Sequence, residues 1–396
     1  GKICIEPKEG RDVLKRLNLP PYVLRIIDKL ILSGYHAYAV GGSVRDMLMG
    51  RQPLDYDIAT SATPKEVQKL FKNTVATGLQ HGTVTVIEPD GKAEVTTFRT
   101  EGNYSDHRRP DKVYFISDIN EDLSRRDFTI NSMAYNDYEG LIDPFGGESD
   151  IKSRLIKTVG DPCLRFSEDA LRILRAFRFM AKLRFTIDEE TLNACVKLSG
   201  TLNKISVERI AFELCEILKA SEPESLNALY KAKILDVVLP EALPWDLGKI
   251  QRVTMSKELP AKWAHLCGEK VSLALRRLKC SNTLRHSASE LASFLNEDIS
   301  DYKTISANLK YNTFEDLCLF LGDLKALEKY RQAVEKGEPM KISDLAIGGR
   351  ELSEYLEGRE IGEALSKLIL HVRKYPEDNN PETLKALLKV LGYLKK

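Results

Sequence analysis

The sequence predicts an α+β protein, in which an N-terminal domain with a mixed β-sheet precedes a long, all-helical remainder. Three observations support this prediction. Up to about residue 150, short β-rich runs alternate with helical segments, whereas the rest of the chain has helical periodicity. A cluster of turn formers, Asp143-Pro144-Phe145-Gly146-Gly147, separates the two regions. The chain of 396 residues also exceeds what one hydrophobic core usually organises.

The strands are predicted from segments rich in β-branched and aromatic residues. Pro89-Asp90-Gly91 separates the third segment from the fourth, so a hairpin should pair these two strands antiparallel. The predicted strands are His36–Val40, Tyr56–Thr60, Gly82–Glu88, Ala93–Arg99 and Val113–Ile116.

The helical region has a capping signal near its start. Ser167-Glu168-Asp169 offers an N-cap and first-turn acids for a helix that should run to about Leu183. Further helices should begin near Glu189, Val207, Ser225, Lys262, Ser287, Phe314 and Ser353. The pattern contains no repeat of fixed period. We therefore expect four divisions, at 1–148, 149–222, 223–320 and 321–396.

The composition argues against a membrane protein and against a protein rich in disulfides or zinc. With 43% hydrophobic and 30% charged residues and no apolar run long enough to cross a bilayer, the chain should be soluble and unattached to a membrane. Its seven cysteines are scattered and form no CxxC pair, which argues against disulfides or zinc and fits the reducing cytoplasm. Because the formal net charge is only +1, any polyanion must be bound by local patches.

A turn suited to phosphate lies after the first predicted strand. In Gly41-Gly42-Ser43-Val44-Arg45-Asp46, two glycines allow backbone N–H groups to turn toward a ligand, and Arg45 adds a cation. The helix that follows contributes the positive end of its dipole. Together these features suit a triphosphate, although an ordinary glycine turn with a solvated arginine would have the same sequence.

A pair of aspartates follows this turn. In the β-like run Leu54–Thr60, strand alternation should direct Asp55 and Asp57 to one face while Tyr56 points away. Two carboxylates on one face can share a hard cation, for which Mg²⁺ is the natural choice. Glu94 is our candidate for a third catalytic carboxylate, because an adjacent antiparallel strand could bring it close. The alternative is that the motif is a solvated surface feature.

Arginines distinguish two later segments, Arg125–Asn131 (RRDFTIN) and Glu168–Phe179 (EDALRILRAFRF). The second segment is apolar on several sides, yet it carries Arg172, Arg175 and Arg178 at three-residue steps. Buried guanidinium groups need anionic or polar partners, because an unpaired buried charge is very costly. Bound phosphate and a base edge would serve, and so would a structural ladder of salt bridges.

Asp169 and Arg172 should be neighbours on the helix of this segment. Cytosine and adenine each present an amino donor beside a ring-nitrogen acceptor, and an Asp acceptor next to an Arg donor complements that pattern. Uracil and guanine present the reverse order and would leave the pair mismatched. We therefore expect the protein itself to select C and A.

These motifs resemble those of the class II CCA-adding tRNA nucleotidyltransferases, a family of the polymerase-β-like superfamily. Three blocks carry the resemblance, with DPFGG between the last two, and looser similarity extends through most of the chain. The blocks are GGSVRDMLMGRQPLDYDIAT (Gly41–Thr60), RRDFTINSMA (Arg125–Ala134) and EDALRILRAFRF (Glu168–Phe179).

The resemblance implies an Mg²⁺-dependent enzyme that uses CTP and ATP to extend the 3′ end of tRNA without a nucleic-acid template. The four divisions would be its head, neck, body and tail, with the later helices holding the acceptor and T arm of tRNA. Asp55 and Asp57 would bind metal, and Asp169 and Arg172 would select the base. The candidate nucleotide-binding residues are Gly41, Gly42, Arg45, Arg126, Asp127, Asn131, Asp169, Arg172, Arg175 and Arg178.

Several alternatives stay open at the level of sequence. The segment Glu101–Pro110 (EGNYSDHRRP) fills a loop that relatives adding only the two cytidines largely lack, which favours addition of full CCA or of the terminal A alone. A bacterial poly(A) polymerase would share the head and neck motifs but should carry a strongly basic C-terminal extension. A catalytically inactive RNA-binding module is a third possibility. The sequence does not determine the oligomeric state.

Overall fold

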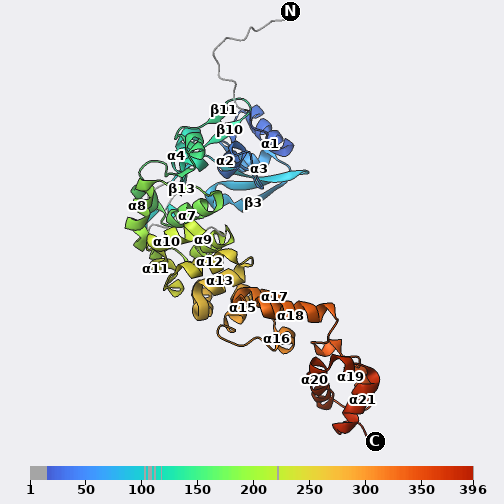
Figure 1. Cartoon of the computed structure of the whole chain (residues 1–396). Coiled ribbons are helices and arrows are strands. Elements are labelled where there is room, and N and C mark those ends of the chain that lie inside the picture. Colours follow the sequence, from blue (N-terminus) through green and yellow to red (C-terminus); the bar gives the residue numbers. More distant parts are fainter. Residues whose placement is uncertain are drawn as a thin grey trace, which may run out of the picture. The chain divides into compact units, whose positions relative to one another are not determined.

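The computed structural model describes residues 16–101, 104–105, 109–110, 113–116, 118–220 and 223–395. The chain divides into two compact units, the first ending at Pro240 and the second beginning at Glu241. Strands gather in the first unit, whereas the second is helical (Figure 1). This architecture confirms the predicted α+β class. The division at Pro240 coincides with neither predicted limit, near residue 222 or near residue 320, so the four-part division stays a prediction.

A seven-stranded mixed sheet forms the centre of the first unit, in the order β11-β10-β1-β2-β5-β4-β3. Its neighbours pair antiparallel, except that β2 and β5 run parallel. The strands are β1 (Ala37–Val40), β2 (Asp57–Thr60), β3 (Thr74–Gly78), β4 (Thr83–Glu88), β5 (Gly91–Thr97), β10 (Ala134–Asn136) and β11 (Gly140–Ile142). Short pairs outside it are β6 (Arg99–Glu101) with β9 (Val113–Phe115), β7 (Tyr104–Ser105) with β8 (Arg109–Pro110), and β12 (Leu155–Ile156) with β13 (Thr186–Ile187).

The five predicted strands are all present, and the hairpin at Pro89-Asp90-Gly91 joins β4 to β5 as expected. Within the seven-stranded sheet, β3, β10 and β11 were not predicted. Strand β3 is mostly exposed, so it lacks the alternation of apolar and polar residues that signals a half-buried strand. The hairpin strands β10 and β11 have three residues each, too few to show a period. Much of the segment Glu101–Pro110, which bears on the subtype, lies outside the described residues.

Packed side chains cover one face of the sheet more completely than the other, and the candidate site lies on the less covered face. On one face, Val84 and Val86 of β4 and Val95 of β5 join a core with the buried side of helix α1 (Pro21–Leu32), beside α3 (Pro64–Leu70). On the other face, a smaller core beneath α4 (Ile119–Ser124) covers β1, β2 and β10. On this second face, Glu94 of β5, Ile87 of β4 and Val75 of β3 stay exposed, whereas Thr85 of β4 is buried.

Helices continue the first unit beyond the sheet. They are α5 (Gly147–Lys152), α6 (Pro162–Glu168), α7 (Leu171–Leu183), α8 (Glu189–Leu198), α9 (Val207–Ala220), α10 (Pro223–Lys231) and α11 (Ile234–Val238), whereas α2 (Gly42–Leu48) lies between β1 and β2. Helix α7 is buried on most sides and packs against α9 and α10, which confirms that the arginine-bearing helix is an interior element.

Three predicted helix starts are wrong. Ser287 lies inside a helix that begins at Asn282, and Ser353 is the C-cap of a helix that ends at Leu352.

The third wrong start is that at Ser167. The expected helix from Ser167 to Leu183 is two helices, because Asp161 caps α6 and Pro162 occupies its first turn. Asp169 follows α6 in an extended conformation, with φ −149°, and interrupts the helix. Asp169 therefore precedes α7 and is not part of its first turn.

The second unit is helical in its described part, which ends at Lys395. Its last two long helices share a core that includes Leu368, Val372, Leu384 and Leu388. No helix in the described ranges is long and apolar enough to span a membrane. The helices are α12 (Leu247–Met255), α13 (Leu259–Cys267), α14 (Val271–Arg277), α15 (Asn282–Ala292), α16 (Tyr302–Asn308), α17 (Phe314–Leu321), α18 (Leu324–Glu335), α19 (Gly349–Leu352), α20 (Arg359–Lys374) and α21 (Pro381–Val390).

Candidate active site

Three carboxylates meet on the open face of the sheet. Asp57, the first residue of β2, is the register partner of Glu94 in β5. Asp55 lies two residues earlier, and all three side chains line one cavity of about 510 Å³, the carboxylate cavity. Tyr56 is turned into the core and only 5% exposed, as alternation requires. The proximity of Glu94 was thus predicted correctly, but the expected antiparallel pairing was wrong, since β2 and β5 run parallel.

The negative charges of these carboxylates repel one another. The pKa of Asp57 is raised, first by desolvation within the cavity wall and then by the negative charge of Glu94, with a smaller contribution from Asp55. A hard divalent cation would relieve this repulsion, and clustered carboxylate oxygens are suitable ligands for one. The described residues contain no group of three or more His, Cys, Asp or Glu side chains placed to hold a metal. One or two carboxylates together with substrate phosphates suffice for Mg²⁺.

The glycine turn between β1 and α2 is built around Arg45. Gly41 has φ +72°, a conformation that favours glycine, and a Cβ there would lie 3.5 Å from Nη1 of Arg126. Arg45 is only 5% exposed and donates from Nη1 to Oδ1 of Asn131 at 2.6 Å. It also donates to Asp46 at 3.0 Å. Arg45 is therefore a fixed interior cation, and the interpretation as a solvated arginine is wrong.

A second cavity, of about 520 Å³, adjoins the carboxylates, and we call it the arginine cavity. Seven arginines and three aspartates contribute to its wall. Asp57 also lines the carboxylate cavity, and is the one described side chain common to both. The lining residues are Gly41, Gly42, Arg45, Asp57, Arg99, Arg125, Arg126, Asp127, Asn131, Asp169, Leu171, Arg172, Arg175, Phe179 and Arg209.

The segment Arg125–Asn131 supplies part of this wall through paired charges. The buried carboxylate of Asp122 accepts from Arg126 at 3.2 Å and from Arg125 at 3.4 Å. Asp127 accepts from Arg175 Nε at 2.7 Å and from the backbone N–H of Phe128. Burial alone would raise the pKa of Asp127, but the positive charges of Arg175 and Arg172 outweigh it and lower that pKa to about 2. Asp127 is thus a permanent anion that orients Arg175.

The three arginines of α7 have different partners. Arg172 binds Glu168 at 2.7 Å, Arg175 binds Asp127 at 2.6 Å, and Arg178 binds the buried Glu213 at 3.1 Å. Because these carboxylates come from three separate segments, the arginines do not form a ladder along one helix face. Arg172 and Arg175 line the arginine cavity, whereas Arg178 does not.

Arg178 instead lies behind the cavity wall. Its guanidinium carbon is 4.9 Å from the centre of the Phe179 ring, and that ring lines the cavity. Arg45 and Arg175 contact the same ring, with guanidinium carbons 5.3 and 5.4 Å from its centre. Three of the predicted arginines therefore make cation–π contacts with the ring of Phe179.

Asp169 and Arg172 both reach the arginine cavity but do not pair with each other through their side chains. The Asp169 carboxylate accepts from Arg209 at 2.8 Å, and Arg172 donates to Glu168 and to the backbone carbonyl of Arg125. The expected relation as neighbours on one helix is wrong, since Asp169 precedes α7. Both residues nevertheless line the arginine cavity, so one ligand could contact both.

Three cavity arginines were not predicted as site residues: Arg99, Arg209 and Arg125, which lies in a quoted motif but was not a candidate. Arg99 follows the strand of Glu94, and its Nη1 donates to the backbone carbonyl of His81 at 2.6 Å. Because Arg99 closely follows Glu94 in the sequence, it could have been predicted as a site residue. Arg209 lies on α9, forty residues beyond Asp169, and its sequence surroundings contain no motif that we could have used.

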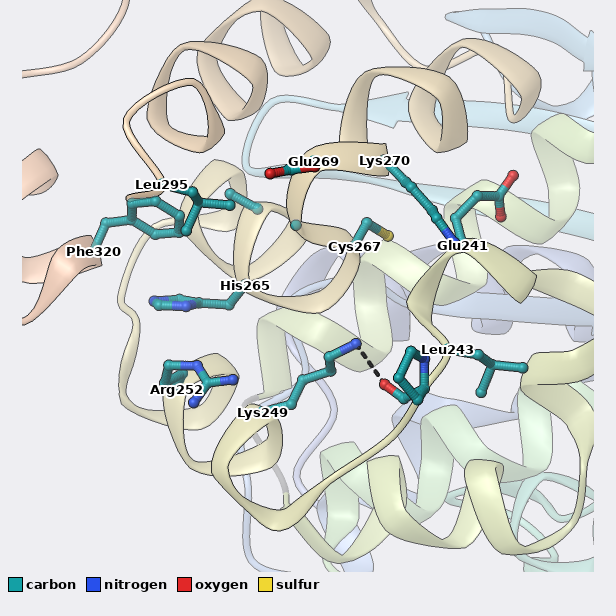
Figure 2. A pocket seen from close by; sticks show the side chains of 13 residues that line it. Glu241, Leu243, Lys249, Arg252, His265, Cys267, Glu269, Lys270, Leu295 and Phe320 are labelled. Carbon is teal, nitrogen blue, oxygen red and sulfur yellow. Dashed lines mark hydrogen bonds between the residues drawn. The ribbon is translucent and has the colours of Figure 1, made fainter. Parts of the chain in front are cut away.

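A third cavity, of about 390 Å³, lies in the second unit (Figure 2). Lys249 points to the carbonyl of Pro244 at 2.9 Å, and Glu241 accepts from Arg277 at 2.6 and 2.8 Å. Desolvation lowers the pKa of His265 to about 4, so its ring is neutral at pH 7. Lys249 and Glu241 thus have partners within the fold, and this cavity has no counterpart to the carboxylate cluster.

Comparisons with known proteins identify the family of this chain. Residues 37–157 match the family model described as the poly A polymerase head domain, and residues 184–245 match that of a probable RNA and SrmB-binding site of polymerase A. The CCA-adding enzyme of Lactobacillus helveticus is 36% identical over 387 residues, covering 92% of this chain and 96% of the relative.

Solved structures extend the likeness to the fold. The crystal structure of the Bacillus stearothermophilus CCA-adding enzyme in complex with CTP superimposes with a TM-score of 0.74 at 32% identity, over 95% of this chain and 98% of that one. The Thermotoga maritima CCA-adding enzyme complexed with tRNA has a TM-score of 0.68 at 23% identity, over 94% and 96%. The carboxylate cluster, the glycine turn and the arginine-lined cavity thus occur in a chain that belongs to the CCA-adding enzyme family.

Proposed function

We propose that this chain adds C, C and A to the 3′ end of tRNA from CTP and ATP, without a nucleic-acid template. The observation that carries the proposal is the position of Asp57, at the junction between a carboxylate cluster and an arginine-lined cavity. Nucleotidyl transfer needs both parts, because one side must bind an anionic triphosphate and the other must stabilise an attacking hydroxyl. Membership of the CCA-adding family supports tRNA as the acceptor.

The arginine cavity is proposed to bind the incoming nucleotide. Gly41 and Gly42 allow the phosphates to approach the backbone, while Arg45 and Arg126 face them with positive charge. Asn131 fixes Arg45, and Asp127 fixes Arg175, so these cations are already oriented before a nucleotide arrives. Arg178 would act from behind the wall, through Phe179.

Base selection is assigned to Asp169 and Arg172. An aspartate acceptor and an arginine donor on one wall complement the Watson–Crick edges of cytosine and adenine. Uracil and guanine would set a carbonyl against the carboxylate and an N–H against the guanidinium, and this mismatch is strongly unfavourable. Arg172→Ala should therefore relax base choice more than it weakens triphosphate binding.

Asp55 and Asp57 are proposed to hold Mg²⁺, which when bound would neutralise the phosphates and lower the pKa of the attacking hydroxyl. The 3′-oxygen of the RNA forms a bond to the α-phosphorus as the bond to pyrophosphate breaks. Glu94 accepts the hydroxyl proton, since it is the remaining carboxylate of the cluster. The arginines orient the departing pyrophosphate.

Each of the four predicted divisions of the chain would have its own role in this reaction. Residues 1–148 would be the catalytic head and 149–222 the neck that selects the nucleotide, with residues 223–320 and 321–396 holding tRNA. We assign the chain to the cytoplasm, where tRNA is processed. Addition of the terminal A alone and poly(A) synthesis are the alternatives that the experiment must separate.

The test uses the full chain with Mg²⁺, all four nucleoside triphosphates and three tRNAs, ending before C, after C and after CC. Sequencing of the products should find completion to CCA on each tRNA and then a stop. Extension of only the third tRNA would indicate an A-adding enzyme, and long A tails would indicate poly(A) synthesis. Asp55→Ala should abolish incorporation without changing the melting curve, whereas the surface variant Asp90→Ala should retain it. Normal turnover by Asp55→Ala would refute the mechanism.

A further inference from the structure

The third cavity, in the second unit, has more basic than acidic side chains in its wall. Its cations are Lys249, Arg252 and Lys270, and its acidic residues are Glu241 and Glu269. Lys249 and Arg252 project from α12, and Lys270 ends the short turn between α13 and α14 (Figure 2). The net charge of the wall depends on which of these groups are compensated within the fold.

The charge of Glu241 is compensated from outside the cavity. Glu241 is only 8% exposed and accepts from Nε and Nη2 of Arg277, which does not line the cavity. Cys267 adds no negative charge, because burial raises the pKa of its thiol to about 12. Three cations therefore face the single uncompensated carboxylate of Glu269, an excess of two positive charges.

Lys249 has carbonyl partners and no carboxylate partner. Its Nζ donates to the backbone oxygens of Ala242 and Pro244, which leaves one of the three ammonium donors for a ligand. Asp246, the N-cap of α12, accepts from the backbone N–H of Lys249 and does not line the cavity. The position of the Lys249 ammonium is thus fixed while its charge is retained.

The other two cations have no partners of this kind. Among the described residues, the side chains of Arg252 and Lys270 form neither a hydrogen bond nor an ion pair. The pKa of Lys249 is lowered by desolvation and further by the charges of Arg252 and Lys270. The pKa of His265 falls to about 4, first through desolvation and then through the charges of Arg252 and Lys262. A bound anion would relieve this repulsion between cations.

The rest of the wall suits a flat, uncharged group. The ring of His265 is neutral at pH 7, and its centre lies 4.5 Å from that of Phe320. Leu243 and Leu295 add apolar surface to the same cavity (Figure 2). Its volume of about 390 Å³ falls in the range of roughly 300–1,000 Å³ that is usual for small-molecule sites.

The excess of positive charge distinguishes between phosphate-bearing ligands. A phosphate monoester carries close to two negative charges near pH 7, whereas each phosphodiester of an RNA chain carries one. We propose that the third cavity binds a free nucleoside monophosphate, with its phosphate among Lys249, Arg252 and Lys270 and its base against His265 and Phe320. This site is separate from the arginine cavity and does not depend on the proposed function.

The ring of His265 provides a local measurement of binding. No histidine lines the carboxylate cavity or the arginine cavity, so a nucleotide bound there does not contact a histidine of the wall. The full chain with isotope-labelled histidine is titrated with AMP and followed by NMR. One ring resonance, identified by its loss in His265→Gln, should shift with a Kd of about 1 mM or tighter. Adenosine should bind at least about tenfold more weakly, because it lacks the phosphate.

A matched pair of double variants tests the cations. Arg252→Gln/Lys270→Gln should weaken the Kd for AMP at least about tenfold, because it removes two charged donors. Lys257→Gln/Arg276→Gln removes an exposed lysine and an exposed arginine of the same unit that do not line the cavity, and should bind AMP within about twofold of the parent. Melting curves establish that both variants fold.

Three outcomes would overturn the inference. They are no shift of the His265 resonance up to about 10 mM AMP, an equal Kd for AMP in both double variants, and a shift produced by a tRNA lacking CCA but not by AMP. The last outcome would assign the cavity to RNA. If the chain binds AMP in this way but incorporates no nucleotide into tRNA, the proposed function fails and the inference stands.

Discussion

Arg209 on α9 holds the Asp169 carboxylate with two donors, Nη2 to Oδ2 at 2.8 Å and Nη1 to Oδ1 at 3.4 Å. Asp169 has no helix to orient it, since it lies in extended backbone between α6 and α7. Its Oδ1 also accepts from the backbone N–H of Leu171. The direction in which Asp169 faces the arginine cavity is therefore set by Arg209 together with the backbone N–H of Leu171.

Arg209→Ala should impair base selection more than nucleotide binding. Without the guanidinium, Asp169 can rotate, and the ratio of correct C to incorrect U incorporation should fall by about tenfold, the effect of a weakened charged hydrogen bond. Competition between CTP and UTP on a tRNA lacking CCA measures this ratio. Arg209→Lys should restore part of it. Lys219→Ala, an exposed variant on the same helix, should leave it unchanged, and a uniform rise in KM for all nucleotides would contradict a positioning role.

Asp57→Asn should separate activity from stability. Because the pKa of Asp57 is raised in the fold, the native state binds more protons than the unfolded chain, and its ionisation lowers stability as pH rises above the ordinary Asp range. In a chelator at pH 7, Asp57→Asn should melt at a higher temperature than the parent. Its incorporation rate should fall on the order of 10³-fold.

Addition of Mg²⁺ should raise the melting temperature of the parent but not of Asp57→Asn, since a ligand stabilises only a fold that binds it. An equal response of both proteins would show that the metal binds elsewhere.

Asp127→Asn should destabilise the first unit, because Arg175 would lose its buried anionic partner, at a cost of about 3 kcal/mol. The sign of the pH dependence follows from the pKa of about 2, which lies below the ordinary value of 3.8. The stabilisation is fully present above the unfolded pKa and is lost as pH falls through about 2.

Urea denaturation of parent and Asp127→Asn should therefore differ most at neutral pH and converge between about pH 4 and pH 2. Asp90→Asn, which alters an exposed ion pair with Arg25, should behave as the parent throughout. A gap between parent and Asp127→Asn that widened in acid would contradict the assignment of Asp127 as a permanent anion.

Gly147→Ala tests the close packing of α5 against the segment Thr129–Met133. A Cβ at Gly147 would lie 2.3 Å from the backbone oxygen of Thr129 and 2.9 Å from Sδ of Met133. Because a backbone oxygen cannot move aside, the substitution should destabilise the first unit by about 1–3 kcal/mol. Gly362→Ala, in open space on α20, should be neutral or stabilising by up to about 1 kcal/mol. Melting curves that rank these variants in the opposite order would contradict the packing.

The local sequence was sufficient to predict most elements that carry chemistry. Gly41 joins β1 to α2, the helix that begins with Gly42 and carries Arg45, because short-range turn and capping preferences decide such junctions. The hairpin after β4 follows from Pro89-Asp90-Gly91, and Asp55 and Asp57 share a cavity because they are two residues apart. Each of these features depends on neighbours in the chain.

The tertiary structure decided which distant groups meet. Pairing of β2 with β5 places Glu94 beside Asp57, and its parallel direction depends on how the chain crosses between them. The contact of Arg209 with Asp169 joins residues forty positions apart, and Arg45 meets Asn131 across eighty-six. A charged side chain in sequence does not specify its partner, because the energy of an ion pair depends on distance and burial. Packing of the sheet and helices alone fixes these two quantities.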